Sequence, residues 1–289
     1  MQTILKTAEQ LRFSIKTTLI CGCLALGMLC ASYWQWGRHI EKQNLILTLQ
    51  GTLKREPTEL ARLALSSPDW SEQIWRRVSV SGVYDFSKEV IVRRNRGATD
   101  EAGFHVITPL KIDSSELYVL VDRGFIPLGR QDREYRKRYQ RVDRVNLYGL
   151  VKGSSTPKFL APKDPQAGLT SEWVDLWIRV NIEAMQRQLP YQVLPVYIEI
   201  LENPEDPLLV NKIVKEGSAG RNDILALTGQ RDVRNFGLAS PDLEYPLAHF
   251  DTTPPPDIHL GYVYEWAFMA VLTVGIGIVA QLRRRRGGE

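Results

Sequence analysis

Two long stretches without a charged residue, one near each end of the sequence, constrain this chain more than any other feature. The first lies between Lys16 and Arg38, and the second lies between Glu265 and Arg283, with the apolar HLGYVY just before it. At about 1.5 Å per helical residue, roughly 20 residues cross a bilayer core of about 30 Å. A soluble helix of this length normally carries a polar face. We therefore predict an α+β membrane protein with transmembrane helices at 17–36 and 258–282.

Basic residues flank both stretches and predict their orientation. Lys6, Arg12 and Lys16 precede the first stretch, and four arginines at 283–286 follow the second. Short basic flanks stay on the cytoplasmic side of a membrane. We expect cytoplasmic tails at 1–16 and 283–289 and an extracytoplasmic domain at 37–257. The first stretch runs into YWQW without a small-residue cleavage pattern, which favours an uncleaved anchor. No Arg/Ser-rich presequence is present, so we expect a bacterial inner membrane with the domain in the periplasm.

The central domain is predicted to be β-rich. Alternating, β-branched segments recur between polar turns in WRRVSVSGVYDF, EVIVRRN, FHVITPLKI, ELYVLVDRGFIPL, RVNLYGLVKG and YQVLPVYIEIL. Short alternating strands joined by turns favour a mostly antiparallel sheet or a small barrel. The segment after Arg38 has helical spacing and is expected to continue the first helix, and residues 172–189 are predicted as a helical insert. Residues 203–256 are predicted as a long loop region.

Motifs of catalysis are absent from the sequence. It contains no Gly-x-Ser-x-Gly, no Gly-rich phosphate loop, no Cys-x-x-Cys and no His-Glu-x-x-His, so we predict that the protein is not an enzyme. All three cysteines lie in the first apolar stretch, which excludes a disulfide framework in the outer domain. The basic stretch 130–144 is interpreted as a solvated charged segment or as a contact for anionic lipid headgroups or an acidic partner. Nucleic acid is not expected on this side of a membrane.

The second apolar stretch carries a stripe of unusual side chains. At about 100° per residue, a narrow arc of the helix holds His259, Tyr262, Trp266, Met269 and Thr273, and Gly277 continues it. A histidine beside aromatic rings and a glycine would suit a flat macrocycle with a ligated iron. Equally, such a stripe is typical of a packing surface between helices. His39 lies just beyond the first helix, so pairing of the two helices would bring His39 and His259 to the same depth.

Several segments, in order, resemble a known family. YWQWGRHIEKQNLI, WRRVSVSGVY, GFHVITPL, VLVDRGFIPLGR and HLGYVYEWAFMA are similar to the surfeit-locus family of cytochrome c oxidase assembly factors. The resemblance covers residues 31–200 and 257–282. It implies a non-enzymatic assembly factor that binds or stabilises haem a while the haem enters subunit I of a haem-copper oxidase. Implied partners are subunit I, haem a synthesis or other assembly proteins, and membrane lipids.

The resemblance also implies site residues. The family's membrane-proximal histidine, the implied ligand of the haem iron, and its tryptophan seven residues later match His259 and Trp266. Its Trp-Gln…Arg element matches Trp34, Gln35 and Arg38. Together with the stripe on the second helix and the shared depth of the two histidines, this gives the candidate cofactor-binding residues His259, Trp266, Tyr262, Arg38 and His39. Arg38 would bind a haem propionate.

The sequence departs from the family pattern at a few positions. Asp122 stands where the family often has asparagine, PDIH precedes the second helix, and residues 203–256 exceed the expected length. Two alternatives remain open: a cofactor-free structural chaperone of subunit I, and an unrelated membrane-anchored envelope sensor or enzyme.

Overall fold

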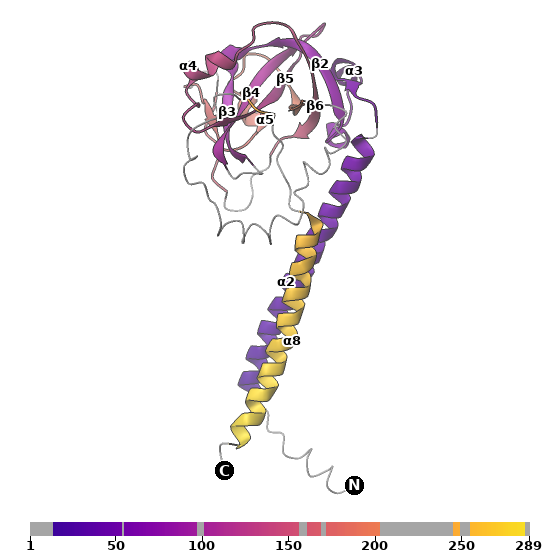
Figure 1. Cartoon of the computed structure of the whole chain (residues 1–289), viewed down its shortest axis with the longest axis vertical. Helices are drawn as coiled ribbons and strands as arrows, with labels where there is room; N and C mark the ends of the chain where they lie inside the picture. Colours follow the sequence, from indigo (N-terminus) through magenta and orange to yellow (C-terminus); the bar gives the residue numbers. More distant parts are fainter. Residues whose placement is uncertain are drawn as a thin grey trace, which may run out of the picture. The chain divides into compact units, whose positions relative to one another are not determined.

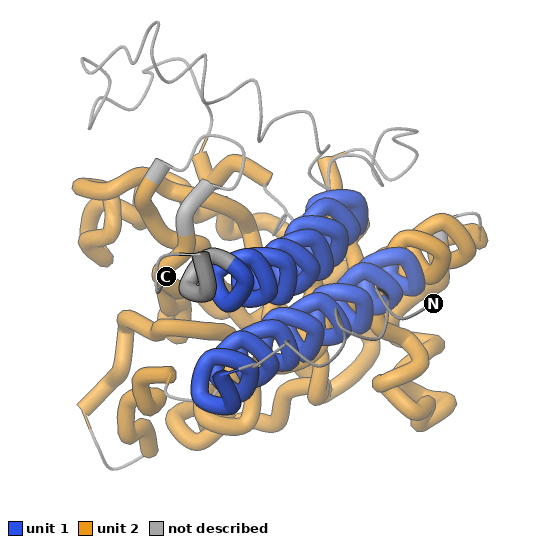
Figure 2. The backbone as a smooth tube through the Cα atoms, turned by 90° about the horizontal axis from the view of Figure 1, so that it is seen from below, with its two compact units in different colours: residues 1–45, 254–289 blue, residues 46–253 orange. Residues whose placement is uncertain are grey.

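The computed structural model describes residues 14–53, 55–96, 101–155, 161–168, 172–202, 245–248 and 255–286. The chain divides into two compact units. One unit comprises residues 1–45 and 254–289, and the other comprises residues 46–253 (Figure 2). The predicted loop region 203–256 lies largely outside the described residues.

The first unit consists mainly of two long helices, the first of which continues into the second unit. Helix α2 spans Ile15–Leu53 and helix α8 spans Pro256–Arg286, and they run side by side in opposite directions (Figures 1 and 2). Both are long and apolar enough to cross a membrane, and only 11% of each apolar window is buried. A core helix of a soluble protein would be mostly buried, so this exposure agrees with helices that face lipid. As predicted, the first helix continues well past Arg38, to Leu53.

The two helices meet along a regular line of contact, here called the helix seam. Its buried and half-buried positions are Cys21, Ala25, Met28, Ser32, Gln35 and His39 on α2 and Pro256, His259, Val263, Trp266, Ala270, Thr273 and Gly277 on α8. The spacing alternates between three and four residues, as in the seam of a coiled coil. Small side chains and a glycine allow the backbones to approach closely, which is how helices associate without a hydrophobic driving force in lipid.

The second unit is a β-barrel with two short additions (Figure 1). Its main strands are β2 (Arg77–Tyr84), β3 (Val90–Arg96), β4 (Glu101–Ile112), β5 (Tyr118–Pro127), β6 (Val145–Gly153) and β8 (Val193–Leu201). The two-residue strands β1 (Thr58–Glu59) and β7 (Leu176–Trp177) extend the edges. Strand β2 pairs with both β6 and β4, so β2, β6, β8, β5 and β4 close on themselves, and most pairings are antiparallel. The predicted α+β fold with a mostly antiparallel domain is confirmed.

Closure of the barrel depends on one corner of β2. Gly82 pairs with Val145 of β6 and with Ile112 of β4, so it belongs to both ladders. A Cβ atom there would collide with the carbonyl oxygen of Lys111. Glycine is therefore required where the strand turns from one neighbour to the other.

The barrel core follows from the alternation read in the sequence. Val78 and Val80 on β2 point inward with Leu110, Val121 and Ile198 from three other strands, and all are at most 2% exposed. Short helices lie between the strands along the chain: α3 (Leu60–Leu65), η1 (Trp70–Gln73), η2 (Phe86–Lys88), α4 (Arg133–Arg136), η3 (Lys137–Tyr139) and α5 (Ile182–Gln186).

The predicted helical insert at 172–189 is wrong over most of its length. Within it only α5 is an α-helix, and Leu176–Trp177 instead forms β7, parallel to β3. The Trp177 ring is fully buried, and its Nε1 donates to the carbonyl oxygen of Val174. Burial of this ring against the sheet overrides the local helical pattern, and the Asn181 side chain then caps α5 by accepting from the amide of Ala184.

Candidate functional site

His259 lies in the helix seam, one turn into α8. Its Nδ1 is 2.8 Å from the side-chain oxygen of Gln35 on α2. Because an amide oxygen only accepts, the ring donates its Nδ1–H in this contact. Its other nitrogen, Nε2, is buried and has no hydrogen-bond partner among the described residues. The imidazole therefore keeps a lone pair on Nε2, which is the chemistry of a metal ligand or of an acceptor for a ligand's proton.

His39 makes a second polar contact across the seam. Its Nδ1 is 2.8 Å from the carbonyl oxygen of Pro256, at the start of α8. The side chain is 4% exposed, and its ring lies 5.6 Å from the ring of Trp36. The two histidines thus both bridge α2 and α8 at the same end of the helix pair. His39 holds the start of α8 through Pro256, and His259 lies three residues further along the same helix.

The other predicted site residues lie differently. Trp266 is half-buried on the seam, two turns beyond His259, whereas Tyr262 is 45% exposed and lies off the seam. Arg38 pairs with Glu41 on its own helix at 2.6 Å. The structure therefore brings His259, His39 and Trp266 onto one line. It leaves Tyr262 and Arg38 on the outside of the helix pair, where both are accessible.

Further contacts fix the register of the two helices. The Ser32 hydroxyl donates to the carbonyl oxygen of Val263 at 2.9 Å, and the Ser14 amide donates to the side chain of Gln281 at 2.9 Å. A Cβ atom at Gly277 would lie only 2.7 Å from the Cys21 sulfur. These contacts lie at both ends and in the middle of the helix pair and hold α2 and α8 in one antiparallel register. That register places His259 opposite Gln35.

Gln35, which contacts His259 across the seam, is not among the site residues predicted from the sequence. It was noted only as part of the Trp-Gln…Arg resemblance. One signal was available: Gln35 is a polar side chain inside an uncharged span, four residues before His39 and therefore on the same helix face. Its partner on α8 could not be read from the sequence, because the register between the two helices was unknown.

The barrel holds a second set of buried polar groups, centred on Glu89. Arg123 contacts one Glu89 oxygen at 2.9 Å, the Arg136 Nε lies 3.2 Å from the other, and Thr108 donates to the carboxylate at 3.2 Å. Arg136 also binds Asp175 at 2.7 Å and is 1% exposed. Burial raises the pKa of Glu89, although both arginines oppose the rise. This cluster fastens α4 to the start of β3.

Most described cations of the basic stretch 130–144 contact groups of their own unit. Arg130 lies over the Tyr245 ring, Arg133 donates to the Ser87 carbonyl oxygen, Lys137 pairs with Glu134, Arg138 lies over the Tyr135 ring, and Arg144 pairs with Asp113. With Arg136 buried, these contacts favour a structural role for the stretch within the barrel.

His105 belongs to a buried pair inside the barrel. Its Nδ1 lies 2.8 and 3.0 Å from the two oxygens of Asp122, and both side chains are fully buried. Arg94 stands 3.6 Å from the same carboxylate, and the Gly124 amide donates to it. Burial would raise the pKa of Asp122, but the attraction of His105 and Arg94 lowers it overall. His105 lies in β4, and its fully buried ring contacts Asp122 inside the barrel.

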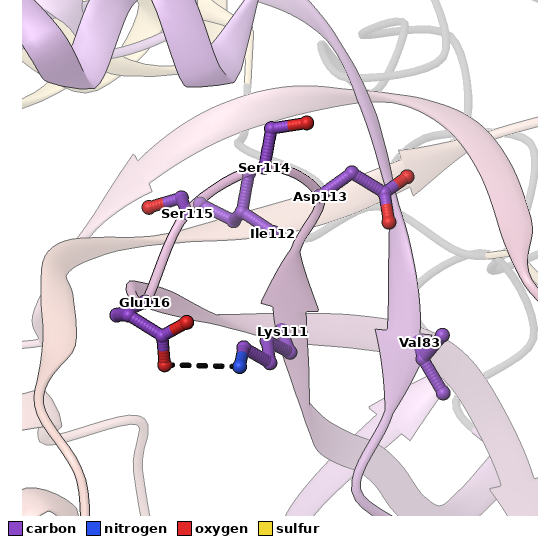
Figure 3. Close-up of a pocket in the computed structure, with 7 residues that line it drawn as sticks. All are labelled: Val83, Lys111, Ile112, Asp113, Ser114, Ser115 and Glu116. Carbon is purple, nitrogen blue, oxygen red and sulfur yellow. Dashed lines mark hydrogen bonds and ion pairs between the residues drawn. The ribbon is translucent and has the colours of Figure 1, made fainter.

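The described part of the barrel carries hollows on its surface. One of about 340 Å³ lies at the β4–β5 hairpin, lined by Val83, Lys111, Ile112, Asp113, Ser114, Ser115 and Glu116 (Figure 3). Lys111 pairs with Glu116 there at 3.0 Å, and Asp113 pairs with Arg144. Among the described residues, no group of three or more His, Cys, Asp or Glu side chains could hold a metal ion. His259 remains the strongest candidate ligand.

Comparison with known proteins relates most of the chain to one family. The SURF1 family model matches residues 20–271. A SURF1-like protein of Monosiga brevicollis is 31% identical over 154 residues, which make up 50% of this chain and 58% of that protein. Surfeit locus protein 1 of Mus musculus is 29% identical over 167 residues, 53% of this chain and 52% of that protein. Surfeit locus protein 1 of Homo sapiens is 28% identical over 169 residues, 53% of each chain.

The chain spans about half the length of the curated relatives it matches. The family match itself covers more than half of the chain and includes most of α2, the barrel and the N-terminal half of α8. The resemblance read from the sequence is thereby confirmed, and the chain belongs to the SURF1 family.

Proposed function

We propose that this protein is an assembly factor for a haem-copper cytochrome c oxidase and holds haem a at His259 during its insertion into subunit I. The SURF1 family is known for cytochrome c oxidase assembly factors. We place the protein in a bacterial inner membrane, with both termini cytoplasmic and the barrel periplasmic. Its partners in this proposal are subunit I, haem a synthesis or other assembly proteins, and membrane lipids. Its role is non-enzymatic.

The buried Nε2 atom of His259 is the observation that carries the proposal. A buried polar atom without a partner is rare in a folded protein and calls for an explanation. An imidazole with its proton on Nδ1 presents the nitrogen that ligates haem iron. The residues present therefore fit a haem. The haem is cargo in this reading, and it would supply an iron that the imidazole nitrogen could bind.

Neighbouring residues supply the rest of the proposed site. Trp266 offers an aromatic wall on the same seam, and the exposed Tyr262 and Arg38 are accessible from outside the helix pair. Arg38 would bind a haem propionate in competition with Glu41, by a charge-assisted hydrogen bond. His39, bound to Pro256, would act by keeping the first turn of α8 in place. Because His259 Nε2 is buried, haem binding requires the side chains around it to move apart.

Spectroscopy of the full chain tests this proposal. The protein is purified from cells that make haem a, and its reduced-minus-oxidised spectrum is recorded beside those of His259→Ala and Tyr264→Ala. Tyr264 is 66% exposed on the same helix and serves as the matched control. We expect a haem a spectrum in the wild type and in Tyr264→Ala, and its loss in His259→Ala.

A haem-free wild type would contradict the haem part of the proposal. The cofactor-free chaperone of subunit I would then be favoured, provided that deleting the gene lowers the amount of assembled oxidase and that subunit I co-purifies with the chain. Normal oxidase assembly after deletion would contradict both readings.

A further inference from the structure

Gln35 and His259 form a polar pair that crosses the helix seam. Gln35 is half-buried on α2 and stands one turn before the buried His39. Its side-chain oxygen meets His259 Nδ1 at 2.8 Å, while His259 Nε2 is buried without a partner among the residues that the structure describes. The glutamine therefore contacts one ring nitrogen of His259 and leaves the other for something else.

The position of the ring proton follows from this contact. With the proton on Nδ1, the ring donates to the Gln35 oxygen and Nε2 keeps its lone pair. With the proton on Nε2, the Gln35 amide would have to turn and donate its NH2 group to Nδ1, and the ring Nε2–H would become a buried donor without an acceptor among the described residues. Buried N–H groups without an acceptor are rarer in folded proteins than buried acceptors without a donor. The pair therefore selects the Nδ1–H form.

We propose that Gln35 is a positioning residue that assigns the proton of His259 to Nδ1 and makes Nε2 the ligating atom. A partner on the non-ligating nitrogen fixes the tautomer and orientation of a histidine ligand and raises its basicity. The effect of Gln35 on haem affinity depends on the proposed function. Its effect on the tautomer of the apo-protein does not.

Two substitutions at position 35 separate positioning from packing. Gln35→Leu has a similar size but accepts no hydrogen bond, so the ring loses its preference for the Nδ1–H form. Gln35→Glu keeps an acceptor at the same place, so at a pH where the ring is neutral it should keep the Nδ1–H form. Gln43→Leu makes the same change at an exposed position of α2 and is the matched control. Loss of an outer partner of this kind typically lowers ligand affinity about 10- to 100-fold.

The experiment measures the tautomer and the haem affinity separately in the full-length protein in lipid nanodiscs. Histidine side chains are labelled with ¹⁵N, the His259 signals are assigned by their absence in His259→Ala, and ferric haem is titrated optically into each variant. We expect an unprotonated Nε2 in the wild type, Gln35→Glu and Gln43→Leu. In Gln35→Leu we expect mixed tautomers and a haem Kd about 10- to 100-fold higher.

Two results would overturn the assignment: a wild-type His259 protonated at Nε2, or a Gln35→Leu protein whose tautomer is unchanged. If no variant binds haem, the proposed function fails, and the tautomer comparison still decides whether Gln35 positions the ring. If haem binds and is lost in His259→Ala, but Gln35→Leu binds it with wild-type affinity, the proposed function stands and the ligand-positioning role of Gln35 is refuted.

Discussion

The barrel buries charged side chains that remain buried because they are paired. Asp122, Arg136, Glu89 and Glu199 are all at most 2% exposed. Such residues are almost never fully buried without partners, because an isolated buried charge is very unfavourable. Removing one partner of a buried pair is therefore strongly destabilising, even where the intact pair adds little net stability. Two predictions follow from this at the level of single residues.

Asp122→Asn is expected to destabilise the barrel in a pH-dependent way. The folded pKa of Asp122 lies below its unfolded value of about 3.9. The ionised carboxylate therefore contributes stability above about pH 4, and this contribution is lost as the pH falls through the depressed folded pKa. At pH 7 we expect a loss of about 3 kcal/mol in the free energy of unfolding, because a buried pair is broken. The gap between variant and wild type should narrow in acid.

Chemical unfolding of the full chain, followed by tryptophan fluorescence between pH 7 and pH 3, measures this gap. Asp113→Asn is the control, because the Asp113–Arg144 pair lies on the surface and such pairs contribute at most about 1 kcal/mol. A constant gap at every pH would show that the charge of Asp122 is not what stabilises the barrel.

Arg136→Ala tests the interpretation of the basic stretch. Because Arg136 is 1% exposed and holds Glu89 and Asp175, its loss leaves two carboxylates without this partner. We expect a loss of about 3–5 kcal/mol in stability. Arg138→Ala, which removes an exposed cation over the Tyr135 ring, should cost less than about 1 kcal/mol. If both variants kept wild-type stability but bound anionic vesicles more weakly, a lipid-binding role would replace the structural one.

Secondary structure was predictable wherever one pattern dominated a segment. The alternation of apolar and polar residues predicted the six main strands, and the two stretches without charged residues predicted both long helices. The segment 172–189 failed because Trp177 is held by β3, a contact between residues far apart in the sequence. The site was predictable only in part, again because some of its contacts join residues far apart in the sequence. His259 stands out in an apolar run, but its pairing with Gln35 depends on a register that no local pattern contains.

The close approach of α2 and α8 at Gly277 yields a prediction at the level of elements. Gly277→Ala would place a methyl carbon 2.7 Å from the Cys21 sulfur, so the helices must separate locally. We expect a loss of about 1–3 kcal/mol, as for overpacked cores. Combining it with Cys21→Ala should recover most of that loss, because the clashing sulfur is gone. SDS titration of the full chain in mixed micelles measures the stability of the helix pair.

Gly275→Ala is the matched control, because a Cβ atom at Gly275 meets nothing within 4 Å. Equal effects of the two glycine substitutions would point to helix propensity or lipid contact as the cause. Independent, additive effects of Gly277→Ala and Cys21→Ala would contradict a direct contact between the two positions.

At the scale of the whole molecule, the length of α2 exceeds what a bilayer needs. Its 39 residues span roughly 58 Å at 1.5 Å per residue, whereas a bilayer core is about 30 Å thick. The uncharged part ends at Arg38, and His39 and Gln35 stand at that boundary. The Ser14–Gln281 and His39–Pro256 contacts bring the ends of the uncharged part of α2 level with the two ends of α8. If α2 and α8 cross the membrane as proposed, the His259–Gln35 pair lies near one rim of the bilayer.

Cysteine labelling tests on which side of the membrane that rim lies. In a chain whose native cysteines are replaced by alanine, Ser114→Cys reports on the exposed β4–β5 turn and Gly288→Cys reports on the C-terminal tail. Because the basic flanks of both spans favour the cytoplasm, a membrane-impermeant maleimide should label Ser114→Cys in intact spheroplasts. It should label Gly288→Cys only after lysis. The opposite pattern would put the His259 end of the helix pair on the cytoplasmic side, where it could not receive haem from the periplasmic face.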